Sequence, residues 1–235
     1  MNIEISVREY FEELQLTEKQ YGQEEELYPW IYMLLKMVEC KKKNDADYYE
    51  GISIRDVHKM CKSEKLSDTQ KNIRSILTND KGVPDMAIID KNSEHILGCI
   101  EIKTFIVNRF QDLIPGSYTE EKDEKGKTQF LPQSDSTNKQ KPLNKQLITQ
   151  VKNCKKVIYT NGLLFYMLKE KSNTEITVEL IGDLEKSFEF FKTENESFDN
   201  MNHTMRSEWD KLIGKLIEID WHSEPKNEIK KNLNT

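Results

Sequence analysis

The chain contains few cysteines and histidines, and neither is spaced as a zinc motif requires. The four cysteines are scattered along the 235 residues, at Cys40, Cys61, Cys99 and Cys154. They form no CxxC pair, and none of the four histidines stands at ligand spacing to them. A zinc site is therefore not expected. Thiols scattered in this way are typical of reduced, mostly buried cysteines in a cytosolic protein.

Long apolar runs are also missing. No stretch approaches the ~18 consecutive apolar residues of a transmembrane helix, and the segment Met1–Tyr10 lacks the basic and apolar regions of a signal peptide. With 36% hydrophobic and 32% charged residues, the composition is typical of a soluble globule. We expect a cytoplasmic protein without a membrane partner, folded as one domain over residues 1–222 and followed by a flexible tail at 223–235.

The chain lacks an excess of positive charge. It has 35 lysines and arginines against 41 acids, a net charge of −6 and a pI near 5.5. A non-specific DNA coat is thereby disfavoured, because phosphate binding relies on lysine and arginine. An enzyme acting on nucleic acid stays compatible with this balance, since a local basic patch binds phosphate while carboxylates lower the total charge.

Two short apolar runs near the middle of the chain predict a β-hairpin. The first run is Pro84–Asp90 and the second is His95–Thr104, with a polar turn between them. Proline is tolerated as the first residue of a strand, where its missing N–H costs no ladder bond. Asp85 therefore stands at the start of one strand, and Glu101 and Lys103 lie on the next.

Glu101 and Lys103 share one face of the second strand, because alternate side chains of a strand point the same way. Ile100 and Ile102 point to the opposite face, into a core. Charged groups on an apolar central strand are costly unless something uses them. A Mg²⁺ ion prefers oxygen ligands, which Asp85, Glu101 and the backbone carbonyl of Ile102 can supply, with Lys103 beside the attacking water. The alternative is a surface hairpin whose charges are merely solvated.

A helix and a second hairpin follow. The segment Gln146–Gln150 opens an amphipathic helix, Lys155–Thr160 is typical of a strand, and Leu163–Lys169 is typical of a returning strand. Between the two strands, Asn161-Gly162 is a strong two-residue turn signal. The order of elements is therefore hairpin, helix, hairpin.

In this order of motifs the chain resembles the PD-(D/E)XK nuclease superfamily, most closely the nuclease domain of type I restriction enzyme motor subunits and their stand-alone relatives. The resemblance rests on Gly82-Val-Pro-Asp85, Ile100-Glu-Ile-Lys103, Gln146 four residues before Gln150, and Thr160-Asn-Gly162 followed by an aromatic-rich strand. It covers about residues 20–170. It implies an α/β fold with a restriction-endonuclease-like αβββαβ core, a central mixed sheet flanked by helices, and additional N- and C-terminal helices.

The resemblance also implies roles for individual residues. Asp85 and Glu101 would bind Mg²⁺ or Mn²⁺, Lys103 would assist the attacking water, and Gln146 would orient Lys103 or contact DNA. In that family a tyrosine usually follows the glutamine by four residues, and here Gln150 stands in its place. This departure concerns the role of the second position and not the metal site.

A glutamate from the first core helix often completes sites of this family. Glu24, Glu25 and Glu26 are the candidates, at the start of a predicted helix over Glu24–Val38. Glu24 shares an inward helical face with Ile31, so we favour Glu24 as the additional metal ligand. The alternative is that these acids only complement the positive end of the helix dipole.

A lysine-rich stretch overlaps the Gln146 helix. Residues 139–156 hold six lysines and no acid. We expect Lys145, Lys152 and Lys155, together with Gln150, to contact nucleic acid. The alternative is an ordinary helix with a solvated lysine face.

Further elements are predicted around this core. Helices are expected at Ser6–Leu14, Ser53–Met60, Ser67–Leu77, Phe105–Leu113, Asp183–Thr193 and Asn202–Ile219. Ser67 would cap its helix, and Glu175–Ile181 alternates as a half-exposed strand near a sheet edge. The stretch 105–145 is the least regular, either a loop that closes over a substrate or plain disorder. The apolar stripe of the last helix covers the core or, alternatively, forms a dimer face.

Together these observations predict a Mg²⁺- or Mn²⁺-dependent endonuclease that hydrolyses phosphodiester bonds in DNA. Defence against foreign DNA is the context that the resemblance implies. A double-strand cut would need a homodimer or two sequential events, because one active site cuts one strand. Two alternatives stay open: a catalytically inactive nucleic-acid-binding or scaffold protein on the same fold, and an RNA endonuclease.

Overall fold

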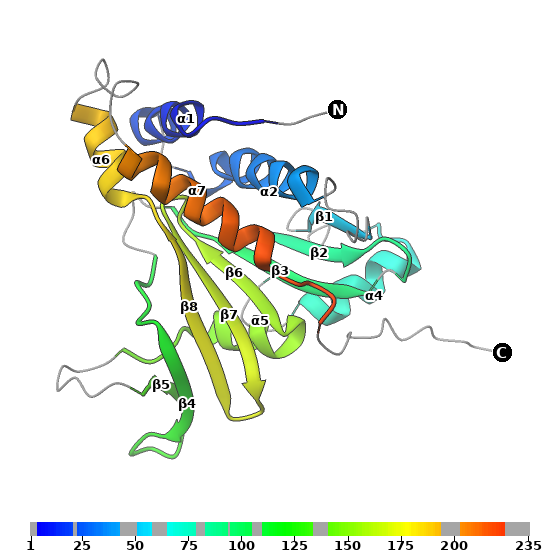
Figure 1. Cartoon of the computed structure of the whole chain (residues 1–235). Coiled ribbons are helices and arrows are strands. Elements are labelled where there is room, and N and C mark those ends of the chain that lie inside the picture. The colour runs from blue at the N-terminus through cyan, green and yellow to red at the C-terminus, as the bar shows by residue number, and fades with distance from the viewer. Residues whose placement is uncertain are drawn as a thin grey trace.

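The computed structural model describes residues 4–20, 23–42, 51–57, 65–78, 83–93, 95–104, 110–133, 141–193 and 203–223. These residues form an α/β fold in which an open mixed sheet of eight strands is flanked by helices on both faces (Figure 1). The strands are β1 (Ile52–Asp56), β2 (Met86–Asp90), β3 (Ile96–Ile102), β4 (Gly116–Lys122), β5 (Thr128–Pro132), β6 (Lys156–Thr160), β7 (Leu164–Ser172) and β8 (Glu175–Asp183). The expected α/β class is confirmed.

The strands lie in the order β1-β2-β3-β6-β7-β8-β4-β5. Only β3 and β6 pair in parallel among these neighbours, and the other pairs are antiparallel. A parallel pair needs a crossover connection, and the connection from β3 to β6 contains the helix α5. This crossover brings α5 against β3, β6 and β7.

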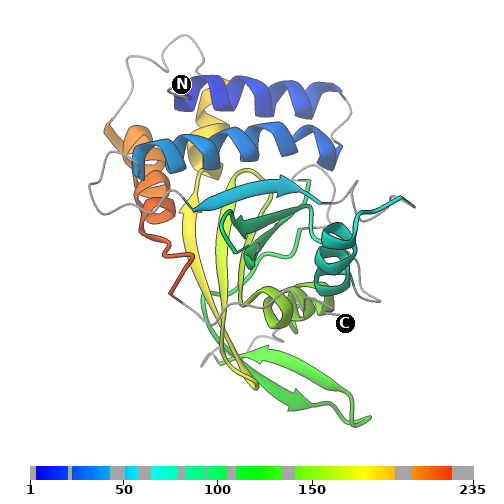
Figure 2. The same cartoon turned by 90° about the vertical axis from the view of Figure 1, so that its right-hand side faces the viewer.

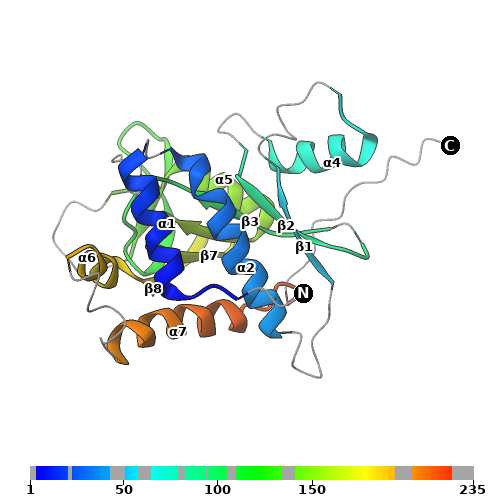
Figure 3. The same ribbon diagram turned by 90° about the horizontal axis from the view of Figure 1, so that it is seen from above.

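Helices cover the two faces of the sheet unequally. They are α1 (Val7–Gln20), the 3₁₀ turn η1 (Glu24–Glu26), α2 (Tyr28–Lys42), α4 (Asp68–Leu77), α5 (Lys145–Cys154), α6 (Glu185–Thr193) and α7 (His203–Glu218). Figure 2 shows α1 and α2 on one face and α4 and α5 on the other, with the β4–β5 hairpin projecting away. Seen from above, α1 and α2 run side by side across the sheet, and α7 runs at a steep angle to both and contacts α2 (Figure 3).

Each face of the sheet buries its own apolar core. Ile100 and Ile102 of β3, both 0% exposed, belong to the core under α1, α2 and α7. Cys99 and the α5 residue Leu147 belong to the core on the other face. The alternation expected for β3 is therefore confirmed, and it leaves Glu101 on the α5 side of the sheet.

Several predicted elements are confirmed. The two central apolar runs form the antiparallel β2–β3 hairpin, whose turn is held by the Asp90 carboxylate accepting from the N–H groups of Asn92 and Ser93. Ser67 caps α4 with a full capping box, because its hydroxyl accepts from the Gln70 N–H and the Gln70 side chain accepts from the Ser67 N–H. The helix, strand and hairpin predicted after residue 145 are α5, β6 and β7.

The helix predicted over Ser53–Met60 is wrong in its described part, which is the strand β1. Ile52 and Ile54 alternate into the core under α2, and β1 pairs with β2 along its whole length. Tertiary pairing therefore overrides the short helical pattern. Residues 58–60 lie outside the described part of the chain.

The prediction of an irregular stretch at 105–145 is also wrong where β4 and β5 form a hairpin. β4 pairs with β8, so two further strands lie between β8 and the edge of the sheet, while the half-exposed alternation expected for this strand is confirmed. Residues 110–113 form no helix, and residues 105–109 lie outside the described chain. In β4 only Tyr118 is buried, so the apolar signal that marks a strand is too weak to read.

The helix predicted to begin at Glu24 starts later. Residues Glu24–Glu26 form the 3₁₀ turn, and α2 begins at Tyr28 with Pro29 in its first turn, where proline is tolerated. Within the ranges described, no helix has both the length and the apolarity to cross a bilayer. Of the predicted tail, Ser223 alone is described, and the remainder lies outside those ranges.

Candidate active site

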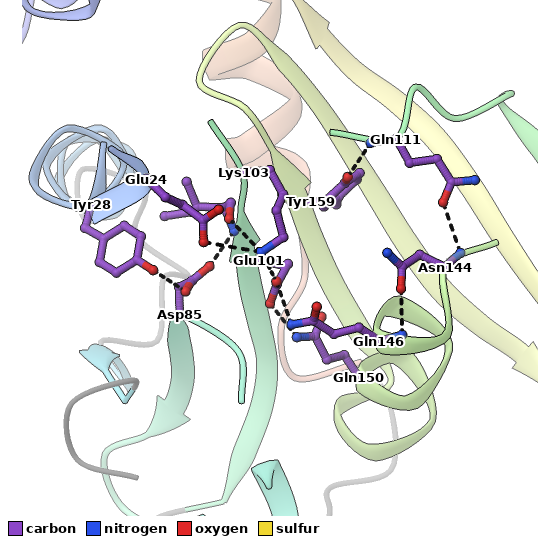
Figure 4. Close-up of polar contacts among 11 residues, drawn as sticks. Glu24, Tyr28, Asp85, Glu101, Lys103, Gln111, Asn144, Gln146, Gln150 and Tyr159 are labelled. Atoms are coloured by element: carbon purple, nitrogen blue, oxygen red, sulfur yellow. Dashed lines mark hydrogen bonds and ion pairs between the residues drawn. The ribbon is translucent and has the colours of Figure 1, made fainter. Parts of the chain in front are cut away.

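A polar cluster lies where β2 begins and β3 ends, between α2 on one face of the sheet and α5 on the other (Figure 4). The Asp85 N–H donates to the Ile100 carbonyl at 3.1 Å, so the pairing of the two strands extends one residue beyond β2. With Met86 opposite Ile100, this register puts Asp85 opposite Glu101. The hairpin therefore brings together two carboxylates that are sixteen positions apart in sequence.

Asp85 is held by two hydrogen bonds and is only 2% exposed. The Tyr28 hydroxyl donates to one carboxylate oxygen, and the Ile102 N–H donates to the other at 2.7 Å. Burial, followed by repulsion from Glu101, raises the pKa of Asp85 to about 8, although both hydrogen bonds oppose the shift. Two carboxylates that disfavour each other's charge are an arrangement that a divalent cation could stabilise.

Glu101 is 1% exposed and is held by two amides from one helix. Gln146 Nε2 donates to Oε1 at 2.7 Å, and Gln150 Nε2 donates to Oε2. The two glutamines are four residues apart, so they lie on the same face of α5. Burial raises the pKa of Glu101, while Lys103 and Gln150 oppose that rise.

Lys103 closes the cluster from the end of β3. Its Nζ forms an ion pair with Glu101 Oε1 and lies 3.3 Å from Glu24 Oε1 and 3.2 Å from the Ile102 carbonyl oxygen. Burial disfavours the charged ammonium, but Glu101, Asp85 and Glu24 outweigh it and raise the pKa of Lys103. The lysine is therefore a firmly charged ammonium with 17% of its side chain exposed.

Tyr28, which belongs to this cluster, and Gln111, which lies beside it, were missed by the sequence reasoning. Tyr28 follows Glu24 by four positions, and this spacing is the one sequence signal that could have placed it at the site. Gln111 connects the segment before β4 to α5, because its N–H donates to the Tyr159 hydroxyl at 2.7 Å and its Oε1 accepts from the Asn144 N–H at 3.0 Å. No local pattern around Gln111 indicates this contact.

Asn144 and Tyr159 link the cluster to its surroundings. Asn144 caps α5, because its side chain accepts a hydrogen bond from the Gln146 N–H at 2.8 Å. This bond fixes the position of the Gln146 backbone in the first turn of the helix. Tyr159 lies on β6 beside Lys103, and Phe110 stacks on its ring at 4.6 Å between centroids. The glutamines that hold Glu101 thus project from a helix whose start is tied down on two sides.

The donor set fits a hard divalent cation. Asp85, Glu101 and the Ile102 carbonyl offer oxygens alone, and Mg²⁺ is commonly held by one or two carboxylates with water and phosphate completing its shell. Across the described ranges, no group of three or more His, Cys, Asp or Glu side chains is close enough to hold an ion by itself. Within the same ranges, the Oε1 of Gln150 is buried without a hydrogen-bond partner, and water brought by an ion would satisfy it.

The residues expected to contact nucleic acid lie in different surroundings. Lys145 is exposed in the first turn of α5. Lys152 donates to the Asn173 carbonyl at 2.8 Å and lies over the Phe130 ring, and Lys155 pairs with Glu170. Gln150 is 2% exposed and holds Glu101. Of the four, only Lys145 is exposed.

The comparisons with known proteins give no match to a family model, to a curated protein or to a solved structure.

Proposed function

We propose that this chain is a Mg²⁺- or Mn²⁺-dependent endonuclease that hydrolyses phosphodiester bonds in DNA. The observation that carries the proposal is the convergence of Asp85, Glu101 and Lys103 at one end of a central hairpin. Two buried carboxylates beside one ammonium are expensive to maintain in a protein interior. The same three groups are those required to bind a divalent cation next to the scissile phosphate.

The order of the elements supports a restriction-endonuclease-like core. The elements α2, β1, β2, β3, α5 and β6 follow one another in the chain as αβββαβ, with α4 and the β4–β5 hairpin as insertions. Strands β1, β2 and β3 form an antiparallel meander, and β6 joins β3 in parallel. The candidate site lies at the end of β3, on the residues Asp85, Glu101 and Lys103 that the resemblance implies as metal-binding and catalytic.

Each residue of the site has a distinct task in the proposed reaction. Asp85 and Glu101, with the Ile102 carbonyl, would hold the ion, which supplies Lewis-acid activation of water and of the phosphoryl oxygen. Tyr28 and the two glutamines orient the carboxylates. The Lys103 ammonium stabilises the negative charge that grows as water attacks phosphorus and the P–O bond breaks.

The surface near the site favours an anionic substrate despite the net charge of −6. The N-terminal end of α5, with Lys145 in its first turn, lies beside Glu101. Helix N-termini carry a positive partial charge and attract phosphate groups. A cytoplasmic role in defence against foreign DNA agrees with this chemistry, and a double-strand cut would require a homodimer or two events.

Two other functions compete with DNA cleavage. An inactive nucleic-acid-binding or scaffold protein would explain the acidic pI, but it has no physical need for a fully connected cluster of Asp85, Glu101 and Lys103. An RNA endonuclease would use the same groups on a different substrate. Both alternatives are distinguished from the proposal by a single assay.

The assay offers supercoiled plasmid and single-stranded RNA to the protein with Mg²⁺, Mn²⁺ or EDTA. We expect nicking of the plasmid with either ion, none in EDTA, and a loss of ~10²-fold or more in Asp85→Asn and Glu101→Gln, because each removes a ligand charge. Glu179→Gln, an exposed carboxylate on β8, is the matched control and leaves the rate unchanged.

Three outcomes would decide against the proposal. Cutting that survives Asp85→Asn would place the active site elsewhere. Cutting of RNA alone would favour the ribonuclease alternative. Tight binding of DNA with no cutting under any ion would favour the binding protein.

A further inference from the structure

The ammonium of Lys103 lies among the oxygens that the proposed function assigns to the metal ion. Its Nζ contacts Glu101 Oε1, lies 3.2 Å from the Ile102 carbonyl oxygen and lies 3.3 Å from Glu24 Oε1. These oxygens come from the strand side chain, the strand backbone and the 3₁₀ turn. Lys103 thus contacts two of the three groups that the proposed function assigns to the ion, and also Glu24, which the sequence favours as an additional ligand.

An ion and this ammonium cannot use the same oxygens together. Glu101 Oε1 already accepts from Gln146 at 2.7 Å and from Lys103, which occupies both of its lone pairs. An ion bound to Glu101 Oε1 at the ~2.0–2.1 Å typical of Mg²⁺ would lie within a few ångström of an ammonium bonded to the same oxygen, and the repulsion between two such charges is strong in a buried site. One of the two present donors must therefore leave.

Lys103 is the donor that can leave. Gln146 is fixed by the capped start of α5 and acts beside Gln150 on the same helical face. Lys103 follows the last residue of β3, has a flexible four-carbon stem, and is partly exposed at 17%. Its ammonium can swing outward without any change in the backbone.

We infer that Lys103 and the divalent ion occupy this oxygen cluster in turn, so that binding of the ion expels the ammonium toward the substrate phosphate. The inference rests on the proposed function and adds a regulatory coupling to it. Without an ion, Lys103 is neutralised by Glu101 and Glu24 and offers little attraction to phosphate. With an ion bound, a substrate phosphate would meet two positive charges, the ion itself and the released Lys103 ammonium.

The first test measures the accessibility of Lys103 in the wild-type chain. The protein is treated briefly with an acetylating reagent in EDTA or in Ca²⁺, and labelling of each lysine is read by mass spectrometry. Ca²⁺ serves as the probe ion because it takes the same oxygen ligands. We expect Ca²⁺ to raise labelling of Lys103 several-fold and to leave that of Lys125, exposed in the β4–β5 turn, unchanged.

The second test measures ion affinity by calorimetry in Lys103→Met and in a matched variant. Lys103→Met removes a competitor for the oxygens, and we expect Ca²⁺ to bind about tenfold more tightly, the effect of losing one charge-assisted contact. Lys145→Met removes an exposed positive charge from the first turn of α5, the helix that holds Glu101. It should change the affinity less than about twofold, since exposed charges are screened.

The outcomes separate this inference from the proposed function. Calcium binding that is lost in Asp85→Asn, with Lys103 labelling unchanged or reduced, would overturn the exchange and leave the metal site standing. Equal affinity gains in Lys103→Met and Lys145→Met would also overturn it, because charge alone would then explain both. Absence of any ion binding by the wild-type protein would overturn both proposals. The labelling test needs no variant, so it holds even if Lys103→Met fails to fold.

Discussion

The carboxyl group of Asp85 makes the stability of the protein depend on pH. Its pKa is about 8 in the folded chain against 3.8 for the unperturbed group, because burial and Glu101 disfavour the charged form. A raised pKa means that the folded state holds the proton more tightly than the unfolded state. The stabilisation is therefore complete below about pH 3.8 and is lost as the pH rises through about 8.

The variant Asp85→Asn checks this dependence, because an amide of the same shape does not titrate. We expect the melting temperature of the wild-type protein in EDTA to fall from pH 5 to pH 8 relative to that of Asp85→Asn, across the interval between the two pKa values. Glu179→Gln, on the exposed face of β8, is the control and should follow the wild type. Parallel curves for Asp85→Asn and the wild type would show that the Asp85 carboxyl is already ionised at pH 5.

Gln150 stands where the nucleases that the motifs resemble usually carry a tyrosine, and its contact explains how it serves the site. It donates to Glu101 Oε2 and is 2% exposed. Gln150→Leu keeps the volume but removes this donor, so we expect a loss of ~1–3 kcal/mol in unfolding free energy and weaker ion binding. Denaturant unfolding and calorimetry with Ca²⁺ measure the two effects. Unchanged ion binding in a folded Gln150→Leu protein would restrict Gln150 to a packing role.

The residues of the site differ in how far they could be predicted from sequence. Asp85, Glu101 and Lys103 were found because strand alternation and a two-strand hairpin are local patterns. Tyr28 is separated from Asp85 by 57 positions, and Gln111 from Tyr159 by 48 and from Asn144 by 33. Such contacts depend on how elements distant in the sequence pack together, and the helical or strand periodicity of a local segment does not predict them.

At the scale of single elements, caps and turns were predictable and weak strands were not. The start of α4 was read correctly because a serine cap and a glutamine three positions later form a local motif. The strand β1 and the β4–β5 hairpin were not, since each owes its conformation to its neighbours β2 and β8. Short segments with few apolar residues carry little information about which partner they will pair with.

The capping box of α4 offers a direct measurement at this scale. Ser67→Ala removes the hydroxyl that accepts from the Gln70 N–H, and we expect a loss of about 1 kcal/mol in unfolding free energy. Ser67→Asp retains an acceptor at the cap and should restore most of the stability. Denaturant unfolding of the three proteins is the measurement. Equal losses in both variants would show that the hydroxyl contributes by something other than capping.

At the scale of the whole molecule, the segment after α7 packs against β3 and β6 at the ends of these strands that lie away from the candidate site. Lys42 donates to the Ile219 carbonyl at 2.7 Å, and the buried Lys156 donates to the Asp220 carbonyl and to the Ser223 hydroxyl. Trp221 is 7% exposed and packs over β3 at Gly98. This end of the chain therefore stabilises β3, the strand that carries Glu101, from outside the site.

Gly98 and Gly214 form a matched pair for testing this closure, because the same substitution meets different surroundings. A Cβ at Gly98 would lie 2.5 Å from a Trp221 ring carbon and 3.0 Å from the Lys156 carbonyl oxygen. Gly98→Ala must therefore displace Trp221 or shift backbone, and we expect a loss of ~1–3 kcal/mol in unfolding free energy.

Gly214 lies inside α7, where no heavy atom of the described chain is within 4 Å of a new Cβ, apart from neighbours and helix backbone. Gly214→Ala should stabilise the protein by ~0.5–1 kcal/mol, since alanine favours the helix. Denaturant unfolding of both variants measures the two opposite signs. A neutral Gly98→Ala would mean that Trp221 yields easily and that the segment after α7 contributes little to holding β3.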